Sequence, residues 1–324
     1  MLLETDGLTK RFGGITAVDG VDFALEAGEL CSIIGPNGAG KTTFFNLLTG
    51  VLEPSDGRIR FDPPGGGVDP VGSAGAESTG SGSALDITAA SPDETALAGI
   101  HRSYQITNLF PTLTVLENVR VAAQAGRGND SWKLWRNVRD FEDHYAEATA
   151  ILERIGLAGE AETVTQNLSH GEKRSLEVGV ALAGDPDLLL LDEPTAGVSS
   201  EGVDEVVALI EDVAEDHSVM LIEHNMEVVM DISDRIAVLH RGELIADGPP
   251  EDVRGDEAVQ EAYLGGYGRE ETGGESAAAG ENDAPADRDG DAAADGGRRV
   301  TAEGGRRAEG GSRLEERSVG GERP

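Results

Sequence analysis

The sequence of 324 residues contains one cysteine, four lysines and few aromatic residues, which make up 4% of the chain. A single cysteine excludes a disulfide within the chain and any metal site built from cysteines alone. No apolar stretch approaches the roughly 20 residues that span a bilayer, and residues 1–6 lack the basic start and apolar core of a signal peptide. We therefore expect a soluble chain that reaches a membrane only through a partner.

Positive charge is also scarce. The chain has 26 Lys and Arg residues against 61 Asp and Glu residues, which gives a formal net charge of -35 and a sequence pI near 4.3. Because nucleic-acid binding requires a basic surface, this balance argues against a nucleic-acid partner. An acidic surface with few lysines repels itself unless salt screens it, which favours a halophilic protein from a high-salt cytoplasm. An ordinary acidic cytosolic protein is the alternative.

Two stretches lack any apolar periodicity. Residues 62–84 are mainly Gly, Ser, Ala and Pro, and we expect a flexible insertion there. Residues 267–324 are almost free of apolar side chains and are expected to form a disordered acidic tail. Residues 268–324 contain 14 acidic residues and 9 arginines, so most of the net negative charge lies on the folded part of the chain.

Elsewhere the periodicity predicts alternating strands and helices. We expect a short strand, a turn at residues 12–14 and a second strand within residues 2–20, then a further strand at residues 21–26. The expected helices include residues 92–98, one or two helices within 132–155, and residues 201–214 and 250–263. Residues 235–240 and 243–248 are predicted to form a strand pair.

The glycine-rich loop in the first part of the chain has the clearest chemistry. An apolar run at residues 31–34, in which Cys31 is expected to be a small buried hydrophobe, leads into a loop that fits G-x-x-x-x-G-K-[ST]. The loop consists of Gly35, Pro36, Asn37, Gly38, Ala39, Gly40, Lys41, Thr42 and Thr43. Its backbone N–H groups can surround phosphate, Lys41 can contact the β- and γ-phosphates, and the Thr42 hydroxyl can ligate Mg²⁺. The strand, the spacing and the Lys-Thr pair together favour the binding of a nucleotide over a strand–turn–helix with incidental glycines.

A second apolar run, residues 188–191, ends in Asp192 and Glu193. At the edge of a sheet beside a phosphate loop, Asp192 can hold Mg²⁺ through water and Glu193 can polarise the attacking water. His224 follows another predicted strand and can hydrogen-bond phosphate and position Glu193. The alternatives are a solvated strand end for the two carboxylates and a histidine satisfied at a helix N-terminus. Phe12 could stack on adenine or cap a hydrophobic turn.

Residues 168–172, Leu-Ser-His-Gly-Glu, complete a motif set that resembles the ATP-binding subunit of an ABC transporter. The resemblance covers residues 2–266 and implies an α/β fold with a P-loop NTPase (RecA-like) core. It also implies an N-terminal antiparallel β-subdomain and an inserted α-helical signature subdomain at about residues 106–184. We therefore expect a single ABC ATPase domain at residues 1–266.

The resemblance also implies residue roles. Phe12 takes the adenine-stacking position, and Gln105 joins the magnesium shell. Ser169 and Gly171 would contact the γ-phosphate of ATP bound by a second ATPase subunit, in a homodimer or a heterodimer. The expected catalytic residues are Lys41, Glu193 and His224. The expected metal site is made by Thr42, Gln105 and Asp192. Outside residues 35–43, the expected nucleotide-binding residues are Phe12, Gln105, Ser169 and Gly171. A monomer is accordingly expected to be a poor ATPase.

Two positions depart from the family pattern. His170 stands where the signature usually has glycine, but Ser169 and Gly171 are kept, so we expect its function to be retained. After Gly197 the family usually carries Asp or Asn, whereas this chain continues Val-Ser-Ser at residues 198–200. Communication between the two ATP sites is then expected to run through serine.

Four segments narrow the resemblance to the ATPases of branched-chain amino acid importers: residues 11–18, 108–115, 221–230 and 261–265. Importers of urea and short amides share most of this pattern. The implied partners are integral membrane permease subunits, contacted through residues 105–114, and indirectly a solute-binding protein. The chain would lie on the cytoplasmic face of the cell membrane. A soluble ABC ATPase acting on the ribosome or DNA and a non-hydrolysing nucleotide sensor are the remaining alternatives.

Overall fold

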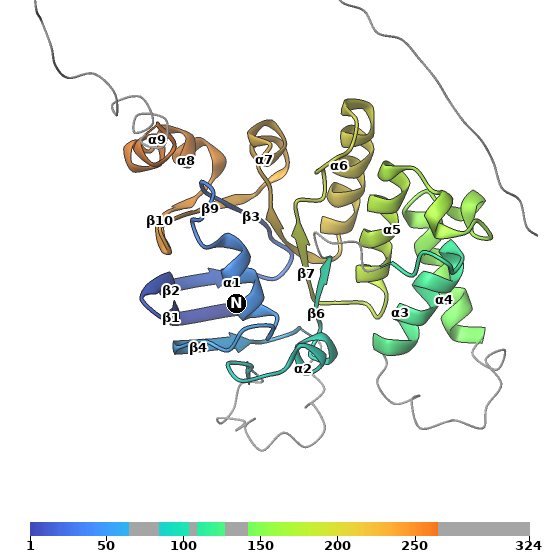
Figure 1. Ribbon diagram of the computed structural model, residues 1–324, viewed down its shortest axis with the longest axis horizontal. Coiled ribbons are helices and arrows are strands. Elements are labelled where there is room, and N and C mark those ends of the chain that lie inside the picture. Colours follow the sequence, from blue (N-terminus) through green and yellow to red (C-terminus); the bar gives the residue numbers. More distant parts are fainter. Residues whose placement is uncertain (65–83, 104–108, 127–141, 265–324) are drawn as a thin grey trace, which may run out of the picture. The chain divides into compact units, whose positions relative to one another are not determined.

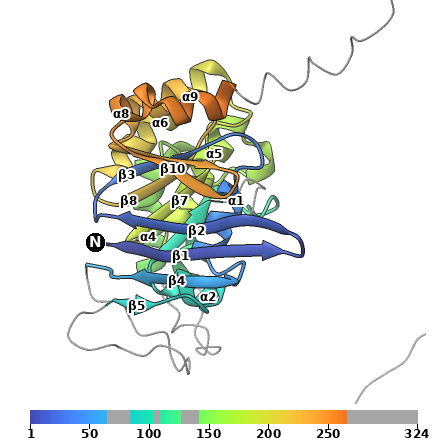
Figure 2. The ribbon, with the colours of Figure 1, turned by 90° about the vertical axis from the view of Figure 1, so that its left-hand side faces the viewer.

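The computed structural model describes residues 1–64, 84–103, 109–126 and 142–264. Its first part is a four-stranded antiparallel sheet in the order β2-β1-β4-β5 (Figure 2). The strands are β1 (Leu3–Phe12), β2 (Ile15–Leu25), β4 (Asp56–Phe61) and β5 (Leu85–Asp86). The turn after Phe12 lies where it was predicted, but the expectation of two separate strands before and after Gly20 was wrong. Strand β2 runs through Gly20, which has a φ of 61°, because glycine adopts this conformation at an irregularity of the pairing.

The second sheet has six strands in the order β10-β9-β3-β8-β7-β6. The strands are β3 (Leu30–Ile34), β6 (Ile100–Ser103), β7 (Leu188–Asp192), β8 (Ser218–Ile222), β9 (Arg235–His240) and β10 (Glu243–Gly248). All neighbours pair in parallel except β9 and β10, which form the predicted antiparallel pair. Every residue of β3, β7 and β8 is buried, as expected for parallel strands covered on both faces.

Helices cover both faces of this sheet (Figure 1). The helices of the described residues are α1 (Lys41–Leu48), α2 (Pro92–Leu97), α3 (Val115–Gly126), α4 (Glu142–Arg154), α5 (His170–Leu182), α6 (Ser200–Ala214), α7 (Met226–Ile232), α8 (Pro250–Gly255) and α9 (Glu257–Leu264). Helix α1 buries Phe44 and Phe45 in a core shared with strands of both sheets. Helices α3 to α6 enclose a second core on the other face of the six-stranded sheet. This mixed α/β arrangement is that of a P-loop NTPase.

The C-terminal helix differs from the prediction of one helix at residues 250–263. Two helices, α8 and α9, meet at Asp256, whose backbone is extended, with a φ of −72° and a ψ of 126°. The Asp256 carboxylate accepts a hydrogen bond from the Val259 amide at 3.1 Å, as an N-cap does. The break therefore follows from a capping residue. Helices α7, α8 and α9 pack around Ile34, the last residue before the phosphate loop.

Several expectations lie partly outside the described residues. They include the insertion after Pro64, the first part of the helix predicted within 132–155, and the tail. Helices α3, α4 and α5 pack against one another and fall within residues 106–184, where the helical subdomain is expected. In the described part of the chain no helix combines the length and the apolar character needed to cross a membrane.

Candidate functional site

The ends of three parallel strands bring the predicted site residues to one edge of the six-stranded sheet. Ile222 of β8 is paired with both Ile33 of β3 and Asp192 of β7, so these three strands end in register. The phosphate loop follows β3. Asp192 ends β7 and Glu193 follows it, and His224 lies two residues after β8. Ligands of open α/β sheets bind at such carboxyl edges. The register therefore places the predicted chemistry together.

The phosphate loop is confined by close backbone neighbours. A Cβ atom on Gly35 would lie 2.1 Å from the Leu239 carbonyl oxygen, and one on Gly40 would lie 2.3 Å from that of Ala17. Both glycines have positive φ, 149° and 106°, so glycine is required here for space as well as conformation. Gly40 is also the N-cap of α1 and has no side chain to cap the N–H groups of the first turn. These groups suit an oxyanion such as a phosphate.

The Lys41 side chain folds back onto the phosphate loop and hydrogen-bonds to its backbone. Its ammonium donates hydrogen bonds to the carbonyl oxygens of Gly35 at 2.6 Å and Pro36 at 3.2 Å. Burial lowers the pKa of Lys41, while the negative charges of Glu193 and Asp192 act in the opposite direction. The positive charge at the phosphate loop is thus within electrostatic reach of both carboxylates. Thr42 is exposed and Thr43 half-buried at the same helix start.

Asp192 is joined to the phosphate-loop helix by an arginine that the sequence analysis missed. The Arg102 guanidinium donates to the Asp192 carboxylate at 2.6 Å and to the Asn46 side chain of α1 at 2.7 Å. The side chains of Arg102 and Asp192 are each only 3% exposed, and the guanidinium lies 5.5 Å from the centre of the Phe45 ring. Arg102 is 90 residues from Asp192 in sequence, so only the pairing of β6 with β7 reveals the contact.

Glu193 and His224 lie in direct contact. The His224 Nε2 atom is 2.9 Å from the Glu193 Oε1 atom. Glu193 has a φ of 51°, which is unusual for a residue with a side chain, and its amide donates to the Ile222 carbonyl at 2.8 Å. Such strained residues cluster at functional sites. A carboxylate paired with an imidazole at the strand edge can accept a proton from a water molecule.

Glu223, immediately before His224, is the second site residue that the sequence analysis missed. Its carboxylate is buried and accepts hydrogen bonds from both the amide and the hydroxyl of Thr195. The only signal in the sequence was an acidic residue directly after an apolar strand and directly before His224.

Phe12 lies at the tip of the β1–β2 hairpin and is 46% exposed. The Lys10 ammonium lies 5.3 Å from the centre of its ring. The same hairpin reaches the phosphate loop farther along β2, because the Ala17 carbonyl lies against Gly40. An exposed aromatic ring on a strand anchored to the loop suits a planar base.

The signature residues begin α5. The Ser169 hydroxyl accepts from the Glu172 amide at 3.2 Å, and the Glu172 carboxylate accepts from the Ser169 amide at 2.7 Å. Hydrogen bonds from Ser169 lower the pKa of Glu172. Gly171 faces Val198, whose Cγ1 atom would lie 4.0 Å from a Cβ added to Gly171. Gln105 lies outside the described residues.

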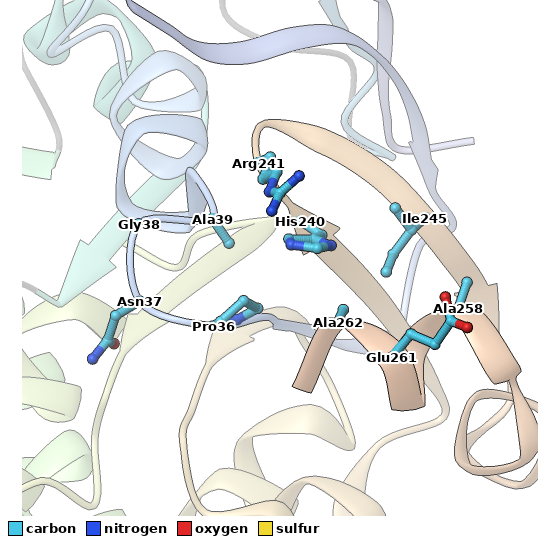
Figure 3. A pocket seen from close by; sticks show the side chains of 10 residues that line it. All are labelled: Pro36, Asn37, Gly38, Ala39, His240, Arg241, Ile245, Ala258, Glu261 and Ala262. Carbon is cyan, nitrogen blue, oxygen red and sulfur yellow. The ribbon is translucent and has the colours of Figure 1, made fainter. Parts of the chain in front are cut away.

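A cavity of about 690 Å³ lies along the phosphate loop, on the side that faces α9 (Figure 3). Its walls come from the loop, the β9–β10 turn and α9: Pro36, Asn37, Gly38, Ala39, His240, Arg241, Ile245, Ala258, Glu261 and Ala262. Lys41, Asp192, Glu193 and His224 do not line it. The reactive groups at the strand edge are therefore separate from this hollow beside α9.

The fold and the strand-edge residues define a P-loop nucleotide hydrolase. A family model described as ABC transporter matches residues 18–196. A second one, described as branched-chain amino acid ATP-binding cassette transporter, matches residues 243–268. The chain belongs to the ABC transporter family as an ATP-binding cassette, and it binds and hydrolyses ATP.

Similar proteins align over almost their whole length. The chain is 37% identical over 270 residues to the high-affinity branched-chain amino acid transport ATP-binding protein BraF of Pseudomonas aeruginosa, covering 82% of this chain and 98% of BraF. It is 36% identical to LivG of Escherichia coli K12, with the same coverage. Among solved structures, the ADP conformation of MJ1267, an ATP-binding cassette of an ABC transporter, has a TM-score of 0.67 and 29% identity, covering 82% of this chain and 98% of MJ1267.

Proposed function

We propose that this chain is the ATPase subunit of an importer for branched-chain amino acids, held at the cytoplasmic face of the cell membrane by an integral permease. The observation that carries this proposal is the match of residues 243–268 to the branched-chain amino acid cassette model. That segment includes β10, α8 and α9, which lie beside the phosphate loop. BraF and LivG, named for branched-chain amino acid transport, support the same assignment.

The described residues fit ATP with Mg²⁺. The crowded glycines of the loop and the uncapped start of α1 suit the phosphates, and Lys41 supplies a positive charge within the loop. Thr42 and Asp192 would hold Mg²⁺, joined by Gln105. Bound Mg²⁺ supplies neutralisation of phosphate charge, while Phe12 stacks against the adenine.

Glu193 is the proposed general base. Its carboxylate orients the attacking water and accepts its proton, and His224 fixes that carboxylate through the 2.9 Å contact. The left-handed backbone at Glu193 directs the side chain from the end of β7 toward this partner. His224 is also available to hydrogen-bond a phosphate oxygen, since its side chain is 48% exposed.

A second ABC ATPase subunit is proposed to complete each site. Ser169 and Gly171 at the start of α5 would meet the γ-phosphate held by the partner, and the helix N-terminus favours this negative charge. ATP then favours the closed dimer, and hydrolysis releases it. The dimer is expected to be the active form.

The permease is proposed to dock beside residues 105–114. Phe110 is 51% exposed, and both its backbone amide and its carbonyl are hydrogen-bonded to the Asn118 side chain, at 2.7 and 3.1 Å. A firmly held, exposed aromatic residue suits a protein partner.

Reconstitution tests the cargo. The chain is co-expressed with the candidate permease subunits, purified from membranes as a complex and placed in liposomes with the solute-binding protein. We expect leucine, isoleucine or valine to stimulate ATP hydrolysis and to be taken up, and urea to do neither. Stimulation by urea alone would assign the importer to short amides. Failure of the chain to co-purify with any integral membrane protein would contradict the transport role.

A further inference from the structure

Glu223 joins two segments of the active edge. The residue follows β8, and its carboxylate is almost completely buried, with the residue 4% exposed. Its Oε1 atom accepts hydrogen bonds from the Thr195 amide at 2.9 Å and the Thr195 hydroxyl at 2.5 Å. Its Oε2 atom accepts from the amides of His224 at 2.9 Å and Asn225 at 3.3 Å. One oxygen thus serves the segment after β7, and the other serves the turn after β8.

Only a carboxylate satisfies this arrangement. All four partners are donors, and an ionised carboxylate has acceptor positions on both oxygens. A glutamine of the same shape would turn an NH₂ group toward donors on one of the two segments, breaking the link there. Hydrogen bonds to a charged acceptor are also stronger than those to a neutral one, especially where water is excluded.

Both linked segments carry a reactive group. Thr195 lies two residues after Glu193, and His224 directly follows Glu223. Glu193 has a left-handed backbone, which the surrounding structure must hold in place. The turn after β8 is fixed on its other side as well, because the Asn225 side chain accepts from the Glu227 amide at 3.1 Å and caps α7.

We propose that Glu223 is a positioning residue for hydrolysis: it fixes the segment after Glu193 against the turn that carries His224, and so maintains their contact. The proposal rests on the roles proposed above for Glu193 and His224. Glu223 itself is buried, with all four of these hydrogen bonds made inside the protein, and is not expected to touch ATP. Its loss should therefore lower kcat and leave ATP affinity unchanged.

The first test is Glu223→Gln in the full-length protein. A misplacement of catalytic groups by about 1 Å costs up to about 100-fold, so we expect kcat to fall about 10- to 100-fold, with KM for ATP and the Kd of a fluorescent ATP analogue within about twofold of the unmutated protein. The pH profile of kcat should also shift, because the contact between Glu193 and His224 changes. The matched control is Glu29→Gln, which removes a charged partner of Arg235 away from ATP. This control should destabilise the fold without changing kcat per folded molecule.

Thr195 gives a second test that does not depend on the folding of Glu223→Gln. Thr195→Val removes one donor to Glu223 and should lower kcat several-fold, whereas Thr195→Ser keeps the hydroxyl and should restore most of it. The positioning role is wrong if Glu223→Gln, like Glu29→Gln, loses stability without a change in kcat per folded molecule. It is also wrong if Thr195→Val and Thr195→Ser both keep the kcat and the pH profile of the unmutated protein.

Glu193→Gln, measured in parallel, separates this inference from the proposed function. If Glu193→Gln retains hydrolysis, the proposed role of Glu193 fails, and the basis of the inference fails with it. If Glu193→Gln loses hydrolysis while Glu223→Gln and Thr195→Val keep it, only the role of Glu223 is overturned.

Discussion

The parallel strands of the six-stranded sheet begin at one edge, the amino end, and finish at the opposite edge, the carboxyl end. Both ends carry buried or half-buried charged side chains, but the contacts of these side chains differ. At the amino end, Arg235 at the start of β9 donates to Glu29 at 2.6 Å and to both oxygens of Asp247 at 2.7 and 2.8 Å. It also donates to the Ala24 carbonyl and lies 5.0 Å from the centre of the Phe23 ring. Burial alone would lower the pKa of Arg235, but its acidic partners raise it. All three guanidinium nitrogens of Arg235 therefore donate hydrogen bonds within the fold.

The carboxyl end combines one more deeply buried pair with groups that are more accessible. Arg102 and Asp192 are as buried as a core residue. In contrast, His224 is 48% exposed, and Glu193 has strained backbone geometry. From this comparison we expect charge at the amino end to serve stability, and charge at the carboxyl end to be divided between stability and chemistry. Substitutions at the two ends should therefore separate in their effects on unfolding and hydrolysis.

Arg102→Met should have the largest effect on stability. It leaves the buried Asp192 carboxylate without its cation, and breaking a buried pair in this way costs about 3–5 kcal/mol. Hydrolysis should fall with it, because Asp192 belongs to the proposed metal site. Urea unfolding monitored by circular dichroism measures the loss. Arg102→Lys is the control, which keeps the charge but not the planar fork that reaches both Asp192 and Asn46. A loss below about 1 kcal/mol for Arg102→Met would contradict the closed-pair description.

Arg235→Met should affect stability alone. The Arg235 side chain is 19% exposed, so its partners keep some solvation, and we expect a loss of about 2 kcal/mol, below the cost of breaking a fully buried pair. The value of kcat per folded molecule should stay unchanged, measured at a temperature where the variant is folded. A fall in kcat comparable with that of Arg102→Met would remove the distinction between the two ends.

Salt should raise stability by screening the acidic surface as a whole, and not through the charged groups at either end of the sheet. If the net charge of -35 reflects adaptation to a high-salt cytoplasm, the unfolding midpoint should rise by several degrees from low to molar KCl. Arg235→Met should show the same rise, because its lost contacts are local. Equal midpoints in low and molar KCl would count against the halophilic interpretation.

His101 should produce the smallest effect, visible only in the pH dependence of stability. Its ring nitrogens lie 2.8 Å from the Ala181 carbonyl and 3.2 Å from the Ala96 carbonyl, and burial lowers its pKa below the usual value of 6.5. The unfolded chain therefore binds the proton first as the pH falls, and the stability present above pH 6.5 is lost below it. His101→Gln should flatten the fall in unfolding free energy between about pH 7 and 5, and His240→Gln is the control. An unchanged slope would contradict this assignment.

The sequence predicted the local features of the site well, because each is a short pattern. The phosphate loop, the run ending at Asp192 and the strand pair at residues 235–248 all lie where they were expected. The contact between Glu193 and His224 also depends on the parallel register of β7 and β8, which the sequence analysis did not predict. The roles assigned to these residues are still predictions.

The missed features depend on contacts between distant residues. Arg102 appears in sequence as one more residue of a short strand, and its importance comes from Asp192 and Asn46, which lie on other elements. The buried Glu223 carboxylate depends on Thr195, 28 residues earlier, for two of its hydrogen bonds. The break between α8 and α9 is different, because Asp256 followed by a helical pattern is a capping signal that could have been recognised.

The role of Glu193 is tested most directly by comparing ATP hydrolysis and ATP binding in the purified full-length protein and in Glu193→Gln. The substitution keeps the shape of the side chain and removes its basicity, so hydrolysis at saturating ATP should fall about 10²- to 10⁴-fold. Binding of a fluorescent ATP analogue should be retained, and ATP should now trap the dimer, which size-exclusion chromatography detects. Hydrolysis within a few-fold of the unmutated protein would contradict the assignment of the strand-edge carboxylate as the general base.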